Sequence, residues 1–257
     1  MTAVAGRLAP PLLGALPIAA LLAVWQAASV TGAVPAALLP SPLAVFGRFG
    51  ASLADPAFLG HVAVTLWRLF AGFVVALVLG VAIGLAGATS RVAGAVVRPL
   101  VRVLAPVPKI ALYPALVLSL GFGDASKIVL VAADATFPIL LATFGGAAAV
   151  EPKLVWSARA AGTSALAAVW KVVLPATLPS ILTGSRIGLV VACIVVFLAE
   201  MIASTDGLGY LLVRAGRNFQ VVDMFVPLVA ISALGLALNG ALALLRRILL
   251  AGFPEEG

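Results

Sequence analysis

The chain has 257 residues, of which 63% are hydrophobic and only 10% are charged, and its mean hydropathy is +1.23. Because a soluble domain carries about 25% charged residues, this composition excludes a water-soluble globular protein and indicates an integral membrane protein. The net charge of +7 is assigned to membrane topology rather than to nucleic-acid binding, since no cluster of basic and aromatic residues occurs. A single cysteine, Cys193, and a single histidine, His61, exclude an internal disulfide and a metal-ligand set, so both are expected in the core.

Six apolar stretches predict six membrane-spanning helices, because about 20 apolar residues cross a bilayer. The first stretch is longer than the apolar core of about 7–15 residues in a cleaved signal peptide, so we expect it to be a retained helix. In chain order, the predicted spans are residues 12–30, 62–88, 100–121, 128–150, 181–203 and 224–245.

Glycine predicts close packing in the second span, and proline predicts a break in the third. Gly80 and Gly84 form a GxxxG pattern in the second span, which predicts close helix packing, inside one subunit rather than at a dimer seam. Lys109 and three prolines interrupt the third span, which predicts a kink or a local break.

The distribution of Lys and Arg predicts the orientation. With the N-terminus inside, nine of the sixteen fall in cytoplasmic segments, four in outer segments (Arg48, Lys127, Arg214 and Arg217) and three within spans (Arg68, Lys109 and Arg186). This excess favours both termini in the cytoplasm, because basic residues accumulate in cytoplasmic loops. We divide the chain into an N-terminal span with its outer loop (residues 1–61), a core permease domain (62–245) and a cytoplasmic tail (246–257).

The segment between the fourth and fifth spans is the longest cytoplasmic connection of this topology. Residues 153–169 are rich in Ala and Leu and predict a short helix, which Gly162 would break or turn. No G-x-x-x-x-G-K-[S/T] phosphate-binding motif occurs in the sequence. An ATPase that acted on this chain would therefore be another polypeptide, and this segment could serve as its contact.

This segment resembles the "EAA" coupling motif of bacterial ABC-importer permeases, with ARAAG at 158–162 followed by VVLP at 172–175. Other stretches are similar to the nitrate/sulfonate/taurine branch of that family, among them LPSPLAV (39–45), TLWRLFAGF (65–73), PVPKIALYPALVLSLGFG (106–123), FPILLAT (137–143), AEMIASTDGLGYL (199–211) and RNFQVVD (217–223). The resemblance assigns contact with the ATPase to Trp156, Ser157, Ala158, Arg159, Ala161, Gly162, Val172, Leu174 and Pro175.

The resemblance implies an all-α membrane protein with six transmembrane helices, in the type I ABC-importer permease fold, with a cytoplasmic coupling helix between spans four and five. It implies a permease subunit that is not itself an enzyme and holds no cofactor, with ATP and Mg bound by the partner ATPase. The implied partners are two copies of the ATPase, a second permease copy that forms a homodimer, an extracytoplasmic solute-binding protein and the lipid of a bacterial inner membrane. No nucleic acid is implied.

The substrate class follows only from the resemblance. It implies a small anion such as an aliphatic sulfonate, taurine, nitrate or bicarbonate, whereas importers of thiamine precursors and riboflavin share the same permease branch. A secondary carrier driven by an ion gradient is a rival interpretation, but such carriers have paired broken helices and only one span is broken here. A structural subunit of a larger membrane complex is a second rival, disfavoured because ionisable residues within spans usually mark function.

One position departs from the family pattern. Where the family usually has the motif glutamate, this chain has Trp156. The indole ring either inserts into the groove of the ATPase as an apolar contact or lies in a helix at the level of the lipid headgroups.

Four ionisable residues in the spans are candidate pathway residues, because a charge in lipid needs a partner or water. Arg186 is close enough to the end of the fifth span to extend to the interface, and Glu200, at the other end, fits a gate or packing role. Lys109 and Asp134 either pair with each other or line the pathway.

The outer loop after the fifth span follows the family pattern for an outer gate. It is a candidate contact surface for the binding protein, and an ordinary solvated loop is the alternative. Its candidate residues are Asp206, Gly207, Gly209, Tyr210 and Arg217.

Overall fold

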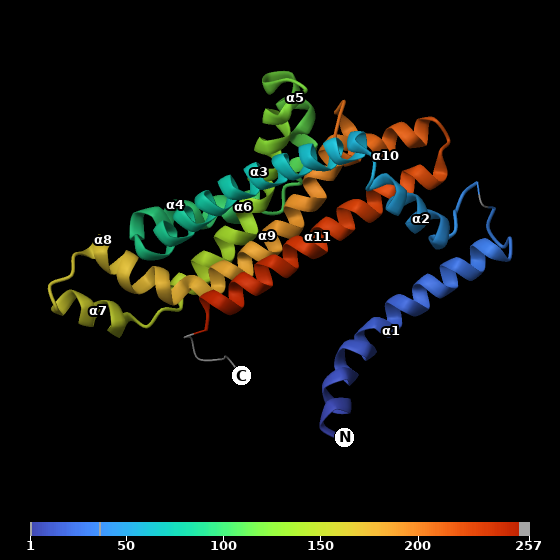
Figure 1. The fold of residues 1–257 in the computed structure, drawn as a ribbon. Helices are drawn as coiled ribbons and strands as arrows, with labels where there is room; N and C mark the ends of the chain where they lie inside the picture. The colour runs from blue at the N-terminus through green and yellow to red at the C-terminus, as the bar shows by residue number, and fades with distance from the viewer. Residues whose placement is uncertain (1, 36, 252–257) are drawn as a thin grey trace. The chain divides into compact units, whose positions relative to one another are not determined.

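The computed structural model describes residues 2–35 and 37–251, with side chains from residue 16 onward. Across these residues the regular structure is helical, without a strand (Figure 1). The chain forms two compact units. The first comprises the chain up to Gly60 with Leu211–Ala230, and the second comprises His61–Tyr210 with the chain from Ile231.

The first unit contains α1 (Thr2–Val30), α2 (Pro42–Ser52), most of α10 (Leu208–Arg217) and the start of α11 (Val221–Leu249). Ser41 caps α2, because its hydroxyl accepts a hydrogen bond from the Ala44 amide at 3.3 Å. The ring of Trp25 packs on that of Phe225 at 5.5 Å between centroids. The ring contact holds α1 to the segment 211–230.

The second unit contains α3 (Pro56–Thr89) from His61 onward, the helices that follow it up to α9 (Leu174–Ile202), the first residues of α10 and the later part of α11. In chain order, the helices between α3 and α9 are α4 (Arg91–Leu104), a 3-10 helix (Lys109–Leu112), α5 (Tyr113–Leu120), α6 (Asp124–Ala148), α7 (Pro152–Ala160), α8 (Ala165–Ala168) and a π-helix (Val169–Val173). Its hydrophobic core is formed by α3, α5, α6 and α9, with Leu69, Val131 and Val196 fully buried.

Small residues bring the core helices close together. A Cβ atom on Gly80 would lie 2.8 Å from Ile139 Cβ, and one on Gly84 would lie 2.7 Å from Thr143 Cβ, so α3 contacts α6 through its glycines. On an adjoining face of α6, Gly184 and Gly188 of α9 approach about as closely, and Gly188 meets the same Ile139. The GxxxG pattern therefore packs inside the subunit, as predicted from the sequence.

Four helical segments of the described chain are long and apolar enough to cross a membrane, namely α3, α6, the run Ala165–Ile202 and α11. A fifth candidate is the pair Arg91–Leu104 and Lys109–Leu120, bent by 84°. This bend confirms the predicted break in the third span. Of the first predicted span, Leu16–Val30 is a shorter apolar helix within α1, and the side chains of 12–15 lie outside the described residues.

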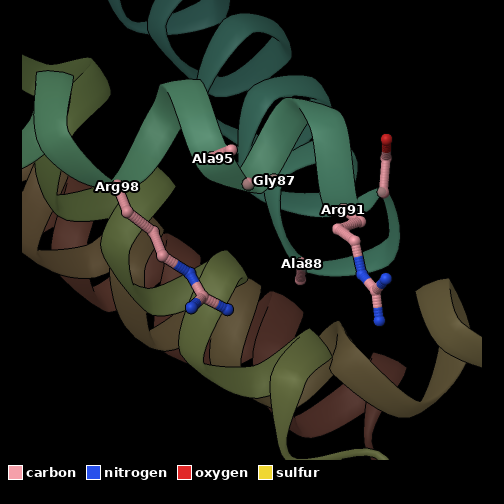
Figure 2. Close-up of a pocket in the computed structure, with 7 residues that line it drawn as sticks. Gly87, Ala88, Arg91, Ala95 and Arg98 are labelled. Atoms are coloured by element: carbon pink, nitrogen blue, oxygen red, sulfur yellow. The ribbon is translucent and has the colours of Figure 1, made fainter.

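A half-open cavity of about 460 Å³ lies at the turn between α3 and α4 (Figure 2). Ser90 caps α4, with its hydroxyl accepting from the Ala93 amide at 3.3 Å. Arg91 and Arg98 extend from the same side of α4 at the edge of this cavity.

Candidate functional site

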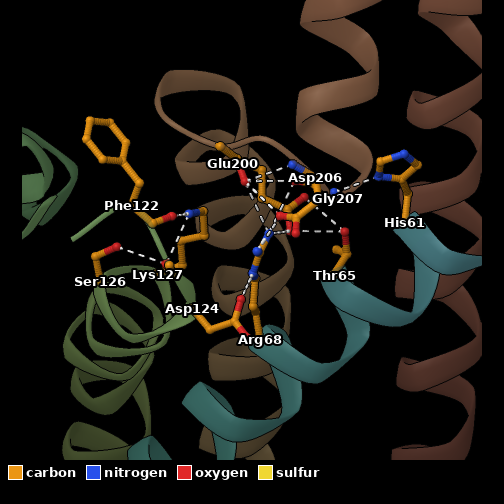
Figure 3. Close-up of polar contacts among 12 residues, drawn as sticks. His61, Thr65, Arg68, Phe122, Asp124, Ser126, Lys127, Glu200, Asp206 and Gly207 are labelled. Carbon is orange, nitrogen blue, oxygen red and sulfur yellow. Dashed lines mark hydrogen bonds and ion pairs between the residues drawn. The ribbon is translucent and has the colours of Figure 1, made fainter. Parts of the chain in front are cut away.

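The most connected polar group in the second unit is the guanidinium of Arg68, on α3 (Figure 3). Its Nε donates to Asp124 Oδ1 at 2.7 Å and its Nη1 donates to Glu200 Oε1 at 3.0 Å. Its Nη2 pairs with the carboxylate of Asp206. The side chain of Arg68 is only 2% exposed, so these ion pairs satisfy a buried cation. We call Arg68 and its three carboxylate partners the Arg68 cluster.

Glu200 is the most buried member of the cluster, with no exposed side-chain area. Its carboxylate also accepts from the Thr65 hydroxyl at 2.9 Å and from the Gly209 amide at 3.1 Å. A buried charge is tolerated when it is paired and its remaining lone pairs are hydrogen-bonded. These bonds tie α3 to the end of α9 and to the start of α10.

The loop that follows α9 folds back onto α3 through its backbone. The amide of Gly207 donates to Nδ1 of His61 at 3.0 Å, and the amide of Leu208 donates to the Thr65 hydroxyl at 2.9 Å. Burial raises the pKa of the Asp206 carboxyl, but the hydrogen bond and the charge of Arg68 outweigh this effect, so the pKa lies below its usual value. Asp206 is therefore an ionised partner of Arg68 at neutral pH.

Lys127, which the sequence analysis counted in an outer segment, lies in the first turn of α6 and is fully buried. Its ammonium donates to the carbonyl oxygens of Phe122 and Gly123 at 2.6 and 3.1 Å (Figure 3). The cation thus closes the turn between α5 and α6 instead of facing solvent.

The sequence analysis identified two of the acidic partners in this cluster, Glu200 and Asp206, and missed the cation that joins them. Arg68 was counted only as a charge within a span. One signal was available, because His61, Thr65 and Arg68 recur at intervals of four and three residues and share one face of a helix. An apolar helix with a single polar stripe indicates polar partners on that side.

Lys109 and Asp134 lie together within the second unit, with Nζ and Oδ1 3.3 Å apart. The Lys109 ammonium also lies 4.2 Å from the centroid of the Phe137 ring and donates to the carbonyl of Val107 at 3.2 Å. The side chains are 10% and 22% exposed. This pairing is one of the two arrangements that the sequence left open.

Replacing Asp134 with asparagine is expected to lower the free energy of unfolding by about 1–3 kcal/mol, because the buried ammonium loses its counter-charge. Adding Lys109→Met, which removes the cation but keeps its volume, should restore most of this loss. Denaturant unfolding in mixed micelles would measure both variants. A double variant as unstable as Asp134→Asn would contradict a structural pair.

The residues predicted to contact the ATPase lie on α7, on the turn that follows it and at the junction of the π-helix with α9. Trp156, Ser157, Ala158 and Arg159 lie on α7, none of whose residues is buried. Gly162 has φ +87°, a conformation that favours glycine, and the chain reverses there before Ser164 caps α8. Val172, Leu174 and Pro175 follow where the π-helix joins α9.

The remaining candidate pathway and outer-gate residues do not form one site. Arg186 on α9 and Arg217 at the end of α10 are exposed. Gly207 and Gly209 both lie against Glu200, and the ring of Tyr210 lies 5.9 Å from that of His61. Residues 206–210, at the end of the loop and in the first turn of α10, thus form a packed, hydrogen-bonded segment within the second unit.

Comparison with known proteins places this architecture among transport components. The family described as "Binding-protein-dependent transport system inner membrane component" matches residues 76–252. A "Putative aliphatic sulfonates transport permease protein SsuC" of Bacillus subtilis (strain 168) is 32% identical, over 92% of this chain and 86% of that protein. The "Taurine transport system permease protein TauC" of Escherichia coli (strain K12) is 31% identical, over 84% of this chain and 80% of that protein.

A solved structure supports the fold. A chain of the MetNI methionine ABC transporter in an inward-facing conformation aligns with a TM-score of 0.68, covering 76% of this chain and 99% of that chain. At 20% sequence identity, this likeness concerns the fold alone.

Proposed function

The chain belongs to the family of binding-protein-dependent transport system inner membrane components, and we propose that it is the permease subunit of an ATP-driven importer of a small sulfonate-type anion. Six spans enclose the pathway, and the first is completed by the N-terminal part of α1. Both termini are cytoplasmic. Two copies of the chain pair with two copies of an ATPase that binds ATP and Mg, and an extracytoplasmic binding protein delivers the solute.

The proposed contact with the ATPase is supported by exposed apolar side chains. The segment from α7 to the π-helix exposes large apolar side chains just before and at the start of the candidate span Ala165–Ile202, where an unpartnered chain would be expected to present polar residues. They are Leu154 and Trp156 on α7, Leu166 on α8 and Trp170 on the π-helix, which are 51–70% exposed. Exposed apolar patches rimmed by polar residues mark interaction surfaces. We define these four residues as the coupling surface.

The substrate class is supported by the relatives, two of which are named for aliphatic sulfonates and taurine. Alternating access would follow from the ATPase moving the coupling surface, which continues directly into α9 through the π-helix. The Arg68 cluster lies toward the opposite end of α9, where Glu200 holds the loop 203–210. Residues 206–210 then form part of the outer gate, and Lys109 with Asp134 stabilises the broken span.

Purification of the tagged chain from native membranes tests this proposal. We expect an ATPase with a phosphate-binding motif to co-purify at one copy per permease, together with a solute-binding protein that binds a sulfonate. Recovery of the chain alone in several mild detergents would contradict the proposal and favour a secondary carrier.

Replacing Trp156 with alanine is expected to weaken binding of the ATPase about thirty-fold, because a buried tryptophan at an interface contributes about 2 kcal/mol or more. Trp67→Ala is the matched control, since Trp67 on α3 is 60% exposed, compared with 67% for Trp156, but lies within a candidate span. Titration of the ATPase onto the reconstituted chain would measure both. A Trp156→Glu variant that raised transport-coupled ATPase activity without weakening assembly would contradict an apolar contact.

A further inference from the structure

The cavity between α3 and α4 is a second candidate site in the second unit. Its volume is about 460 Å³, and its lining includes Ser90, Arg91 and Arg98 (Figure 2). None of these residues belongs to the Arg68 cluster or to the coupling surface. Two arginines at one cavity indicate an anionic ligand.

The walls of the cavity are held in place by close packing. A Cβ atom on Gly94 would lie 2.6 Å from the carbonyl oxygen of Gly87, so the first turn of α4 lies directly against the end of α3. The Arg98 guanidinium carbon lies 5.4 Å from the centroid of the Phe144 ring on α6. The site is therefore formed by closely packed helices.

Within residues 2–35 and 37–251, no acidic side chain neutralises the positive charge at this cavity. Among the residues that the structure describes, no carboxylate forms an ion pair with Arg91 or Arg98. Arg91, Arg98 and Arg102 are seven and four residues apart, which places them within about 40° of one another around the helix. The N-terminus of α4 adds its partial positive charge next to Arg91.

The charge pattern of α3 places this cavity at the surface of the bilayer. Residues 69–90 carry no charge, and at 1.5 Å per residue they extend about 33 Å, close to the thickness of the hydrocarbon core. One end of this stretch is Arg68 and the other is the cavity. The cavity therefore lies at the level of the lipid headgroups.

The neighbouring face of α4 is apolar and exposed. Val92, Val96 and Val103 are 55–78% exposed and lie about 120° around the helix from Arg91. A basic stripe beside an apolar stripe holds charge at the headgroups and turns apolar side chains toward the acyl chains, as in helices of the membrane interface. Such a surface can bind one molecule through both a phosphate group and its hydrocarbon.

We propose that this cavity binds the headgroup of an anionic phospholipid, with Arg91 and Arg98 donating to its phosphate and the valine stripe contacting its acyl chains. Basic pockets on the cytoplasmic side of membrane helices are suited to such headgroups. The proposal does not depend on the transported solute.

Native mass spectrometry of the assembled transporter, released from nanodiscs of phosphatidylglycerol and phosphatidylcholine, tests this site. We expect one phosphatidylglycerol retained per copy of the chain. The variant Arg91→Gln/Arg98→Gln should retain it about thirty-fold more weakly, since each surface arginine contributes about five-fold to binding of an anionic membrane. Arg246→Gln/Arg247→Gln, which removes the same charge from the end of α11, should retain it as the native chain does.

Three outcomes would overturn the proposal. The first is equal retention by Arg91→Gln/Arg98→Gln and the native chain. The second is displacement of phosphatidylglycerol by inorganic phosphate at equal concentration, which would identify the ligand as free phosphate. The third comes from a photoreactive amino acid in place of Ala95, which lines the cavity. Cross-linking to the ATPase or to a second permease, instead of to lipid, would show that a protein covers the site.

Discussion

Replacing Arg68 with alanine is expected to lower the free energy of unfolding by about 3–5 kcal/mol, because removing one member of a buried ion pair leaves its partner charged and unpaired. Glu200 has no exposed side-chain area and accepts from Arg68 at 3.0 Å. Asp124 and Asp206 are 46% and 43% exposed, so water can replace the guanidinium for them. Most of the loss therefore arises at Glu200.

Unfolding in mixed micelles measures this effect, with Arg48→Ala as the matched control. Arg48 pairs with Asp223 at 2.6 Å, but these side chains are 54% and 33% exposed. Removing a pair of this kind costs less than about 1 kcal/mol. Combining Arg68→Met with Glu200→Gln removes both buried charges and should recover most of the stability. A loss for Arg68→Ala no larger than that for Arg48→Ala would contradict a buried cluster.

Replacing Gly207 with alanine is expected to cost at least about 2 kcal/mol, from backbone strain and overpacking together. Gly207 has φ +95°, which L-amino acids rarely adopt. A Cβ atom there would clash with the carboxylate of Glu200. That carboxylate cannot move aside without breaking its bonds to Arg68 and Thr65.

The control for Gly207→Ala is Gly32→Ala. Gly32 also has positive φ, at +73°, but a Cβ atom there meets nothing within 4 Å. Its substitution measures the backbone strain without the clash. Thermal unfolding of both variants in detergent would separate the two contributions. Equal losses would mean that the contact between Gly207 and Glu200 does not limit the packing of the loop.

We propose that the Arg68 cluster keeps the outer gate closed. It joins α3, the start of α6, the end of α9 and the loop 203–210 through one guanidinium. Partly opened arrangements of this network are unfavourable, because moving Glu200 away from Arg68 would leave a buried charge without its partner. A gate built on it would open as a unit.

The sequence alone determined the features that depend on nearby residues. The apolar runs predicted the helices, the prolines around Lys109 predicted the 84° break, and Gly162 predicted the turn after α7. Gly80 and Gly84 predicted tight packing, and the structure shows that their partner is α6. Each of these follows from local backbone chemistry or from the periodicity of one helix.

Only the tertiary structure decided which charges meet. Arg68 joins Asp124 and Glu200, which are 56 and 132 positions away in the chain. The sequence only counted Lys127 among the basic residues of the outer segments, whereas the structure shows its buried ammonium donating to the carbonyl oxygens of Phe122 and Gly123. A buried charge is stable only when groups from several helices converge on it. That convergence is set by the packing of α3, α6 and α9, and a linear pattern of residues does not specify it.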